Sequence, residues 1–373
     1  MTLRKSFMIL SNLKNNRILR SVAVCLFCTA FLSGVSGSLV GCDSDATDDS
    51  TNYTANVTGD ADEIRVYDAA PAVEILETEP ETETEEKSGT DLIFFMGQSN
   101  MSGRGDVSLA PHVPEEAGME FRAFSDPTTL YPLTEPFGRA ENNPKGLCEK
   151  DVEDKCGSLV SAFVNEYHKL TGNKVIAVSV SMGGLAMDLW IADMFYSDVE
   201  SRINTAKSYL ESLGIVPEHT YVVWLQGESD TSREIPAEDY EANFRLFFDR
   251  VCSNGIDEVF VILPGMTSFT SSYTGIVDVQ KDICAGDDRF CLATTVIRGL
   301  SDECFADAYH LNQHALNLVG TESAKAAAYY VLNGRKPVIY DYAIGENYVP
   351  SGSGDFVGEC IEKISLDNVN EEF

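Results

Sequence analysis

The feature that most constrains the fold is a series of short apolar runs, each closed by a turn residue. The first run is Leu92–Met96, which Gly97 follows directly. Continuous apolar runs of this length are typical of strands that are buried on both faces. Later runs follow the same pattern at residues 174–180, 221–225, 259–263 and 290–297. The series predicts a buried, parallel sheet.

The segments between these runs have the apolar periodicity of helices. Apolar residues recur at helical spacing in 158–170 and in 238–251, and a long segment that is rich in alanine near its end spans 311–332. Strands that alternate with helices predict an α/β domain with helices on both faces of a parallel sheet. Once flanking segments are set aside, about 245–280 residues remain, which is a normal size for one α/β domain.

The N-terminal segment 1–42 is predicted to be an export signal. A basic stretch ends at Arg20, and the apolar run Ser21–Val40 follows it, which is the usual order in a signal peptide. The last four residues, Leu39 to Cys42, resemble the bacterial lipobox, in which the cysteine is lipidated. We therefore expect an extracellular protein that a lipid at Cys42 anchors to a membrane. The alternatives are an ordinary cleaved signal with secretion, and an uncleaved anchor of about twenty residues.

The next segment, 43–90, is predicted to be a disordered acidic linker. It carries fifteen acidic and two basic residues, a composition that cannot bury enough apolar surface to fold. The catalytic domain is expected at 91–335, and 336–373 reads as a C-terminal extension. The formal net charge of the whole chain is −32, so a nucleic-acid partner is excluded because its phosphates would be repelled.

The cysteines allow disulfides but do not predict a metal site. Export would bring the chain into oxidising conditions, and the close pairs Cys148/Cys156 and Cys284/Cys291 are the easiest to join. None of the cysteine spacings matches a zinc site, and the chain has only five histidines. We expect no structural zinc.

Chemically active residues follow the predicted strands. In open parallel sheets, binding sites form beyond the carboxyl ends of the strands. Three strand ends carry polar or glycine-rich segments, and a fourth such segment precedes the last helix. They are residues 97–101, 181–184, 224–230 and 307–312. The fold predicts that these four segments meet at one edge of the sheet.

Their residue types suit acyl transfer. Ser99 can act as a nucleophile from a tight turn after Gly97, and His310 can accept its proton. Asp307, three residues earlier, can hold the other ring nitrogen of His310. Each motif alone is more often a turn or a helix cap, so only the combination is informative.

An oxyanion would need hydrogen-bond donors in the same place. The candidates are the N–H groups of Ser99 and Gly183 and the side-chain amide of Gln226. Glu228 competes with Asp307 for the role of orienting the base, because its segment faces the same edge.

Together the four segments resemble the sequence blocks of the SGNH hydrolases, and within them the sialate O-acetylesterase and acetylxylan esterase branch, carbohydrate esterase family six. GQSNM at Gly97–Met101, QGESD at Gln226–Asp230 and the Asp307–His310 pair carry the resemblance, which spans about residues 91–334. The resemblance implies a flavodoxin-like three-layer α/β/α sandwich with a central parallel sheet, and neither a metal nor an organic cofactor.

The resemblance also implies roles for the residues quoted above. Ser99 would be the nucleophile and His310 the base, with Asp307 orienting the base and with Ser99, Gly183 and Gln226 as oxyanion donors. Gln98, Asn100 and Glu228 are assigned to substrate binding. The chain departs from the branch at Leu225, where a histidine often stands before QGE.

The expected function is hydrolysis of acetyl esters on sugars, with acetylxylan, sialic acid or a similar acetylated glycan as substrate. A lipase, thioesterase or arylesterase of the same fold is one alternative. A catalytically inactive, glycan-binding surface lipoprotein is another, although an intact set of Ser99, Asp307 and His310 argues against it.

Overall fold

The structure, a computed structural model, describes four parts of the chain: residues 89–149, 154–268, 274–350 and 361–373. The predicted signal at 1–42 lies outside the described residues, and so does the predicted linker at 43–90 apart from its last two residues. Of the helices in the described parts, none is long and apolar enough to span a membrane.

Strands and helices alternate through most of the described chain. In chain order the elements are β1 (Thr90–Gly97), α3 (Ser99–Ser102), η2 (Val107–Leu109), β2 (Gly118–Arg122), β3 (Asp126–Pro132), α4 (Val160–Thr171), β4 (Lys174–Ser181), α5 (Met187–Trp190), α6 (Asp193–Ser212), β5 (Thr220–Leu225), α7 (Glu228–Ser232), α8 (Ala237–Cys252), β6 (Glu258–Ile262), α9 (Gly275–Gly286), β7 (Phe290–Thr294), η4 (Val296–Gly299), η5 (Asp302–Cys304), α10 (Gln313–Asn333), β8 (Ile339–Asp341), β9 (Glu346–Tyr348) and α11 (Val369–Glu372).

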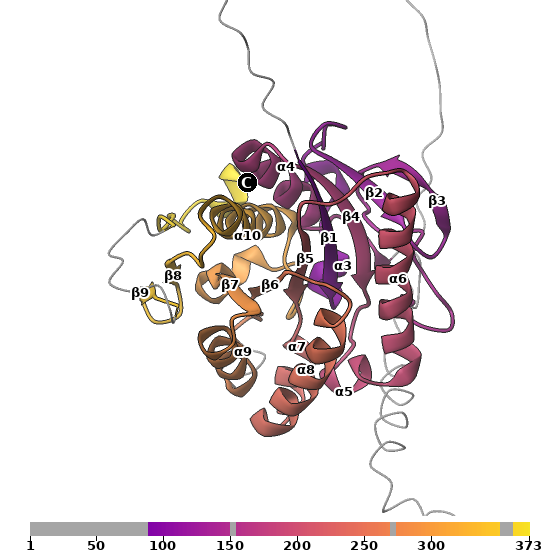
Figure 1. Cartoon of the computed structure of the whole chain (residues 1–373). Coiled ribbons are helices and arrows are strands. Elements are labelled where there is room, and N and C mark those ends of the chain that lie inside the picture. Colours follow the sequence, from indigo (N-terminus) through magenta and orange to yellow (C-terminus); the bar gives the residue numbers. More distant parts are fainter. Residues whose placement is uncertain (1–88, 150–153, 269–273, 351–360) are drawn as a thin grey trace, which may run out of the picture. The chain divides into compact units, whose positions relative to one another are not determined.

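The main sheet has the order β3-β2-β4-β1-β5-β6-β7 (Figure 1). Neighbouring strands are parallel except β3, which runs antiparallel to β2 at the edge. The predicted α/β class is confirmed, and the strands predicted from apolar runs are β1, β4, β5, β6 and β7. One detail differs from a simple flavodoxin-like order, in which the second strand lies beside the first. Here β4 lies between β2 and β1.

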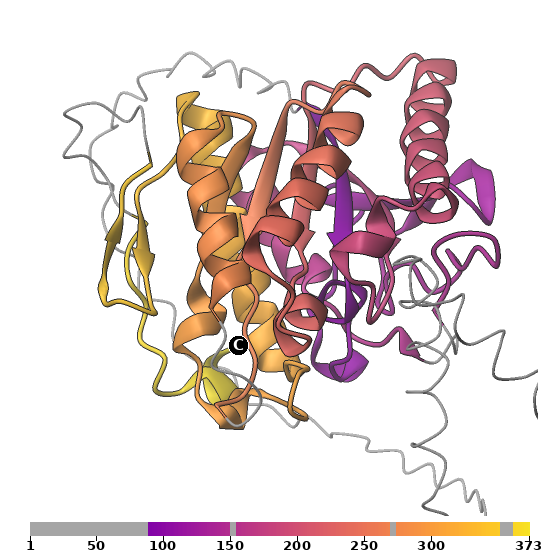
Figure 2. The same cartoon turned by 90° about the horizontal axis from the view of Figure 1, so that it is seen from below.

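Helices cover both faces of the sheet, which gives the predicted three layers (Figures 1 and 2). Alternate residues of β1 face opposite sides of the sheet because successive side chains in a strand point in opposite directions. Phe94 packs in a core with residues of α6, α8 and α9, whereas Phe95 packs in a second core with residues of α4 and α10. A strand buried in this way on both sides requires the continuous apolar run seen in the sequence.

The carboxyl end of β1 is the switch point of the sheet. The chain leaves β1 toward β2 and β4 on one side and later continues to β5, β6 and β7 on the other. In register, Gly97 of β1 pairs with Ser181 of β4 and with Leu225 of β5. Because the three strands end side by side, the segments that follow them are brought together, and such a point is where open α/β sheets bind ligands.

The described C-terminal extension packs on the domain. β8 and β9 pair as a hairpin, and α11 lies against α10. Asn317 of α10 donates its side-chain amide to the main-chain oxygen of Phe373 at 2.7 Å, and Asn312 donates to Asn370 Oδ1 at 2.8 Å. The last residues of the chain are therefore attached to the start of α10, close to His310.

The two disulfides that the cysteine spacing allows are not formed in the structure. Cys148, Cys284 and Cys291 are free thiols, so neither of the two close pairs is joined. Cys284 and Cys291 are buried in the two cores, where they behave as small apolar side chains.

Candidate active site

The predicted nucleophile lies in a tight turn at the end of β1. A Cβ atom on Gly97 would lie 2.0 Å from the main-chain oxygen of Leu225, and Gly97 has a φ of +149°, so only glycine fits. The N–H of Gln98 donates to the same oxygen at 3.1 Å. Ser99 then begins the short helix α3, where its N–H has no partner within the helix.

The predicted pair of Asp307 and His310 is in contact. Asp307 Oδ2 lies 2.7 Å from His310 Nδ1, and Asp307 Oδ1 accepts the main-chain N–H of His310 at 2.9 Å. Burial would raise the pKa of Asp307, but hydrogen bonds from His310 and Tyr309 outweigh it and lower the pKa. With Nδ1 held in this way, Nε2 is the ring nitrogen left for a nucleophile. Of the two carboxylates considered from the sequence, Asp307 is the one in contact with His310.

Asn100 connects the nucleophile turn to the histidine segment. Its amide donates to the main-chain oxygen of Tyr309 at 3.0 Å, and its Oδ1 accepts the N–H of Leu311 at 3.0 Å. The second amide hydrogen donates to Glu228 Oε1 at 2.8 Å. Asn100 is only 1% exposed and, unlike Gln98 and Glu228, it does not line the cavity described below, so a substrate in that cavity does not reach it. The assignment of Asn100 to substrate binding is therefore corrected: this side chain fixes His310 relative to Ser99.

Ser99 and His310 both line one cavity of about 530 Å³. Polar and charged residues dominate its wall. The lining residues are Gln98, Ser99, Arg104, Cys148, Glu149, Asp154, Met182, Gly183, Gly184, Glu228, Ser229, Ser232, Arg233, Tyr309 and His310. Arg104 and Glu149 were not identified from the sequence. Arg104 follows the GQSNM segment closely and was a possible candidate, whereas Glu149 belongs to no motif.

Gly183 lies where the sequence placed it, but its N–H is occupied. The N–H of Met182 donates to the main-chain oxygen of Gly97 at 3.0 Å, which holds this loop beside the nucleophile turn. The N–H of Gly183 donates to Glu149 Oε1 at 2.8 Å, and Glu149 Oε2 accepts from Arg104 at 3.2 Å. An oxyanion could use the Gly183 N–H only after this carboxylate has moved.

The structure does not support Gln226 as an oxyanion donor. Its side chain is fully buried and does not line the cavity. Both amide hydrogens are used, because Nε2 donates to the main-chain oxygen of Leu185 and to Asp230. Its Oε1 accepts from the hydroxyl of Tyr240 at 3.0 Å. Gln226 therefore links the loops behind the cavity to one another, and its predicted role as an oxyanion donor is corrected.

Glu228 and Gln98 line the cavity although both side chains are almost fully buried, and their assignment to substrate binding stays a prediction. Gln98 Oε1 accepts from the N–H of Ser229 at 3.2 Å. Glu228 Oε1 is held by Asn100, and its Oε2 is buried with no hydrogen-bond partner among the described residues. Burial raises the pKa of Glu228 to about 7, despite the hydrogen bond from Asn100 that lowers it.

The raised pKa of Glu228 predicts a pH dependence of stability. A carboxyl whose pKa is higher in the folded state than its usual 4.5 stabilises the fold below pH 4.5, and this stabilisation is lost as the pH rises through 7. Glu228→Gln keeps a neutral side chain of the same shape. We expect its free energy of unfolding to fall by about 2 kcal/mol less than that of the wild type between pH 5 and pH 8.

Urea unfolding at the two pH values measures this difference, with the exposed Glu303→Gln as the matched control. Equal pH dependence in Glu228→Gln and the wild type would show that Glu228 is charged throughout this range.

Metal-binding chemistry has no obvious location in the described residues. Within them, no group of three or more His, Cys, Asp or Glu side chains is arranged to hold a metal ion. The groups around the cavity include a hydroxyl, an imidazole held by a carboxylate, and main-chain N–H groups.

Comparison with known proteins agrees with this class of site. Residues 89–329 match the family model described as "Carbohydrate esterase, sialic acid-specific acetylesterase". The match covers more than half of the chain, so the chain belongs to this family of carbohydrate esterases. It is a carboxylic-ester hydrolase with the acetylesterase activity of the family. No curated protein matches the chain.

Several solved structures are similar at low sequence identity. A protein from Arabidopsis thaliana is 18% identical, with a TM-score of 0.48, over 66% of this chain and 99% of that one. A carbohydrate acetylesterase from Xanthomonas citri is 14% identical, with a TM-score of 0.42, over 66% of this chain and 57% of that one. The esterase EstA from Pseudoalteromonas sp. is 12% identical, with a TM-score of 0.34, over 65% of this chain and 100% of that one.

Proposed function

We propose that this protein hydrolyses acetyl esters on carbohydrate by a Ser-His-Asp mechanism. The observation that carries the proposal is the arrangement of three residues at the carboxyl end of β1. Ser99 and His310 line one cavity, and Asp307 holds His310 Nδ1 at 2.7 Å. This arrangement supplies a nucleophile, a base and a group that orients the base.

The proposed reaction has two steps. Ser99 Oγ attacks the acetyl carbonyl carbon while His310 Nε2 takes the hydroxyl proton. The tetrahedral intermediate collapses, and His310 returns the proton to the sugar oxygen, which leaves as an alcohol. Water then attacks the acetyl-enzyme while His310 takes one of its protons. As the bond to Ser99 Oγ breaks and acetate leaves, His310 returns this proton to Ser99 Oγ.

The oxyanion of each tetrahedral intermediate needs donors near Ser99. The N–H groups of Ser99 and Gly183 are the two candidate donors, because the side-chain amide of Gln226 is used elsewhere. Donors of this kind contribute about 10²–10³ in kcat each. In the structure, the carboxylate of Glu149 accepts the hydrogen bond of the Gly183 N–H.

The polar wall of the cavity favours a sugar over a long acyl chain. Met182 is the one large aliphatic side chain in the lining. The charged or basic side chains that line the cavity are Arg104, Glu149, Asp154, Glu228, Arg233 and His310. Sugar hydroxyls can exchange hydrogen bonds with such a wall, whereas an acyl chain of eight or more carbons would bury charge without compensation. The ionisable side chains of the cavity wall therefore favour a carbohydrate esterase over a lipase.

Acetate release from acetylated xylan and from O-acetyl sialic acid, measured in parallel, tests the proposal and separates the two substrates. The same protein is assayed on p-nitrophenyl acetate and p-nitrophenyl decanoate. We expect kcat/KM for the acetyl ester to exceed that for the decanoyl ester by about tenfold or more, because the longer chain would cover charged side chains of the cavity wall.

A preference for the decanoyl ester would move the assignment to a lipase or arylesterase of the same fold. No release from any ester, together with retained glycan binding, would favour the inactive lipoprotein.

Anchoring at the cell surface is part of the proposal and rests on the sequence alone. Cys42 would carry the lipid, and the acidic segment 43–90 would hold the domain away from the membrane. If Cys42 is lipidated, labelled palmitate is incorporated into the wild type in a bacterial host and not into Cys42→Ala. Equal labelling of the two proteins, or none in either, would leave secretion through an ordinary signal.

A further inference from the structure

Glu149 places a carboxylate on the main-chain N–H of Gly183 and beside Arg104. Its Oε1 accepts the N–H of Gly183 at 2.8 Å, and its Oε2 pairs with Arg104 at 3.2 Å. The side chain is only 4% exposed although it lines the cavity. The product acetate is also a carboxylate, and the reaction intermediate carries an oxyanion. All three anions suit the same two donors.

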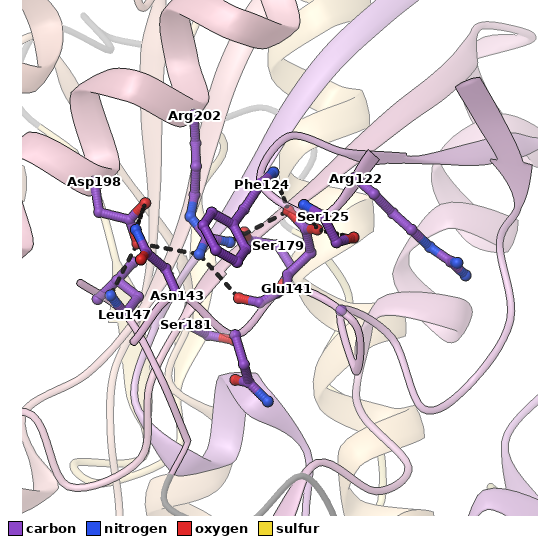
Figure 3. Close-up of polar contacts among 12 residues, drawn as sticks. Arg122, Phe124, Ser125, Glu141, Asn143, Leu147, Ser179, Ser181, Asp198 and Arg202 are labelled. Carbon is purple, nitrogen blue, oxygen red and sulfur yellow. Dashed lines mark hydrogen bonds and ion pairs between the residues drawn. The ribbon is translucent and has the colours of Figure 1, made fainter. Parts of the chain in front are cut away.

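The segment before Glu149 is firmly attached to the domain. Asp198 of α6 accepts the main-chain N–H of Leu147 at 2.8 Å and the side-chain amide of Asn143 at 2.9 Å (Figure 3). The N–H of Glu149 itself donates to Asn142 Oδ1 at 3.0 Å. These bonds fix the main chain immediately before the carboxylate, so its direction toward Gly183 is built into the loop.

The same network ties this loop to β4, the strand that leads to Gly183. Arg202 of α6 is almost fully buried and donates to Asp198 at 3.1 Å and to the main-chain oxygen of Ser179 at 2.9 Å. It also donates to the main-chain oxygen of Glu141 at 2.9 Å (Figure 3). Arg202 therefore bonds both to the segment that precedes Glu149 and to β4, the strand that leads to Gly183.

Gly183 itself is shaped for this contact. A Cβ atom there would lie 2.5 Å from Arg104 Nη2 and 3.0 Å from Glu149 Oε2, so the ion pair lies directly over the glycine. A single N–H cannot serve a carboxylate and an ester oxygen equally well, and two anions a few ångströms apart repel each other.

We propose that Glu149 is an internal inhibitor of the active site, whose carboxylate must leave the Gly183 N–H before an ester carbonyl can be polarised there. The inference rests on the proposed function, because it takes Gly183 as an oxyanion donor. Arg104 gives the carboxylate a second partner. When the carboxylate is absent, Arg104 and Gly183 together form a site for a small carboxylate such as acetate.

The test compares the full-length wild type with Glu149→Ala and Glu149→Gln on p-nitrophenyl acetate, with Ser99→Ala in each background as the blank. We expect kcat/KM to rise about tenfold or more in Glu149→Ala, which corresponds to about 1.4 kcal/mol. Glu149→Gln should lie between the two, because a neutral amide oxygen is a weaker acceptor than a carboxylate. The exposed Glu303→Ala serves as the control and should match the wild type.

Inhibition by sodium acetate gives a readout that a merely structural role would not change. Acetate should inhibit Glu149→Ala at a concentration at least tenfold lower than the wild type, because it can take the vacated position between Gly183 and Arg104. Glu149→Gln should show no such gain, because the amide still fills the site.

An unchanged or lower kcat/KM in Glu149→Ala, with unchanged sensitivity to acetate, would overturn the inference. If Glu149→Ala does not fold, as judged by its thermal unfolding, Glu149→Gln decides: a kcat/KM no higher than that of the wild type overturns it. If the wild type shows turnover that depends on Ser99, but the Glu149 variants have the kcat/KM and the acetate sensitivity of the wild type, the inference alone is overturned. No Ser99-dependent turnover in any of the proteins overturns the proposed function and the inference together.

Discussion

Ser99→Ala should lower acetate release by about 10⁴-fold or more, because it removes the oxygen that forms the acetyl-enzyme. Ser99 is almost completely buried in the first turn of α3, and alanine fits the same space. The free energy of unfolding should therefore change by no more than about 1 kcal/mol. Acetate is measured with an enzyme-coupled assay, and stability by urea unfolding of the same preparations.

Ser102→Ala is the matched control for this substitution. Ser102 is the last residue of the same short helix, and its hydroxyl is buried with no hydrogen-bond partner among the described residues. It does not line the cavity, so this variant should keep its activity. Full activity in Ser99→Ala would rule out Ser99 as the nucleophile and would return the search to the other hydroxyls of the cavity wall, Ser229 and Ser232.

His310→Ala should lower kcat by about 10³–10⁴-fold, because no other base would take the proton of Ser99. The loss should appear in kcat more than in KM, since the ring acts on the proton and not on the sugar. Steady-state kinetics on p-nitrophenyl acetate separates the two constants. The exposed His112→Ala is the control and should behave as the wild type. A loss confined to KM would make His310 a binding residue.

Asp307→Asn distinguishes the two carboxylates that the sequence left as alternatives. We expect a loss of about 10²-fold in kcat, smaller than for a buried triad, because the side chain of Asp307 is 54% exposed and water can partly replace its charge. Glu228→Gln should cost less, because Glu228 is held by Asn100 and not by His310. The reverse order of the two losses would give the orienting role to Glu228.

The sequence predicts the parts of the site that local pattern determines. A buried strand followed by glycine fixes where Ser99 lies, and three-residue spacing allows Asp307 to reach His310. Both arrangements are present in the structure. The catalytic roles of these residues remain predictions, which the variants above test.

The hydrogen-bond partners of the oxyanion candidates could not be predicted in the same way. Gly183 and Gln226 have the residue types of donors, but whether their N–H groups are available depends on distant segments. Glu149 comes from a loop that carries no motif. The amide of Gln226 donates to Asp230 within its own segment and also to the main-chain oxygen of Leu185, which belongs to a separate loop. Whether a donor is available to an oxyanion therefore depends on its contacts in the folded chain, and residue type alone does not reveal them.

Two kinds of element were missed for different reasons. The helix α6 has apolar residues at helical spacing, including Val199, Ile203 and Leu210. Many charged residues lie between them and obscure the periodicity in the sequence. The strand β2 has only five residues, and its neighbour β3 at the edge of the sheet is largely polar and exposed, as edge strands often are. Their strand character comes from pairing with β4 and with each other, which sequence alone does not reveal.

The attachment of Asn370 and Phe373 to α10 gives the His310 segment a support that lies outside the cavity. Asn370 bonds to Asn312, which caps α10 two residues after His310. Substitutions that break these contacts are therefore expected to shift the imidazole although every residue of the cavity wall is left intact.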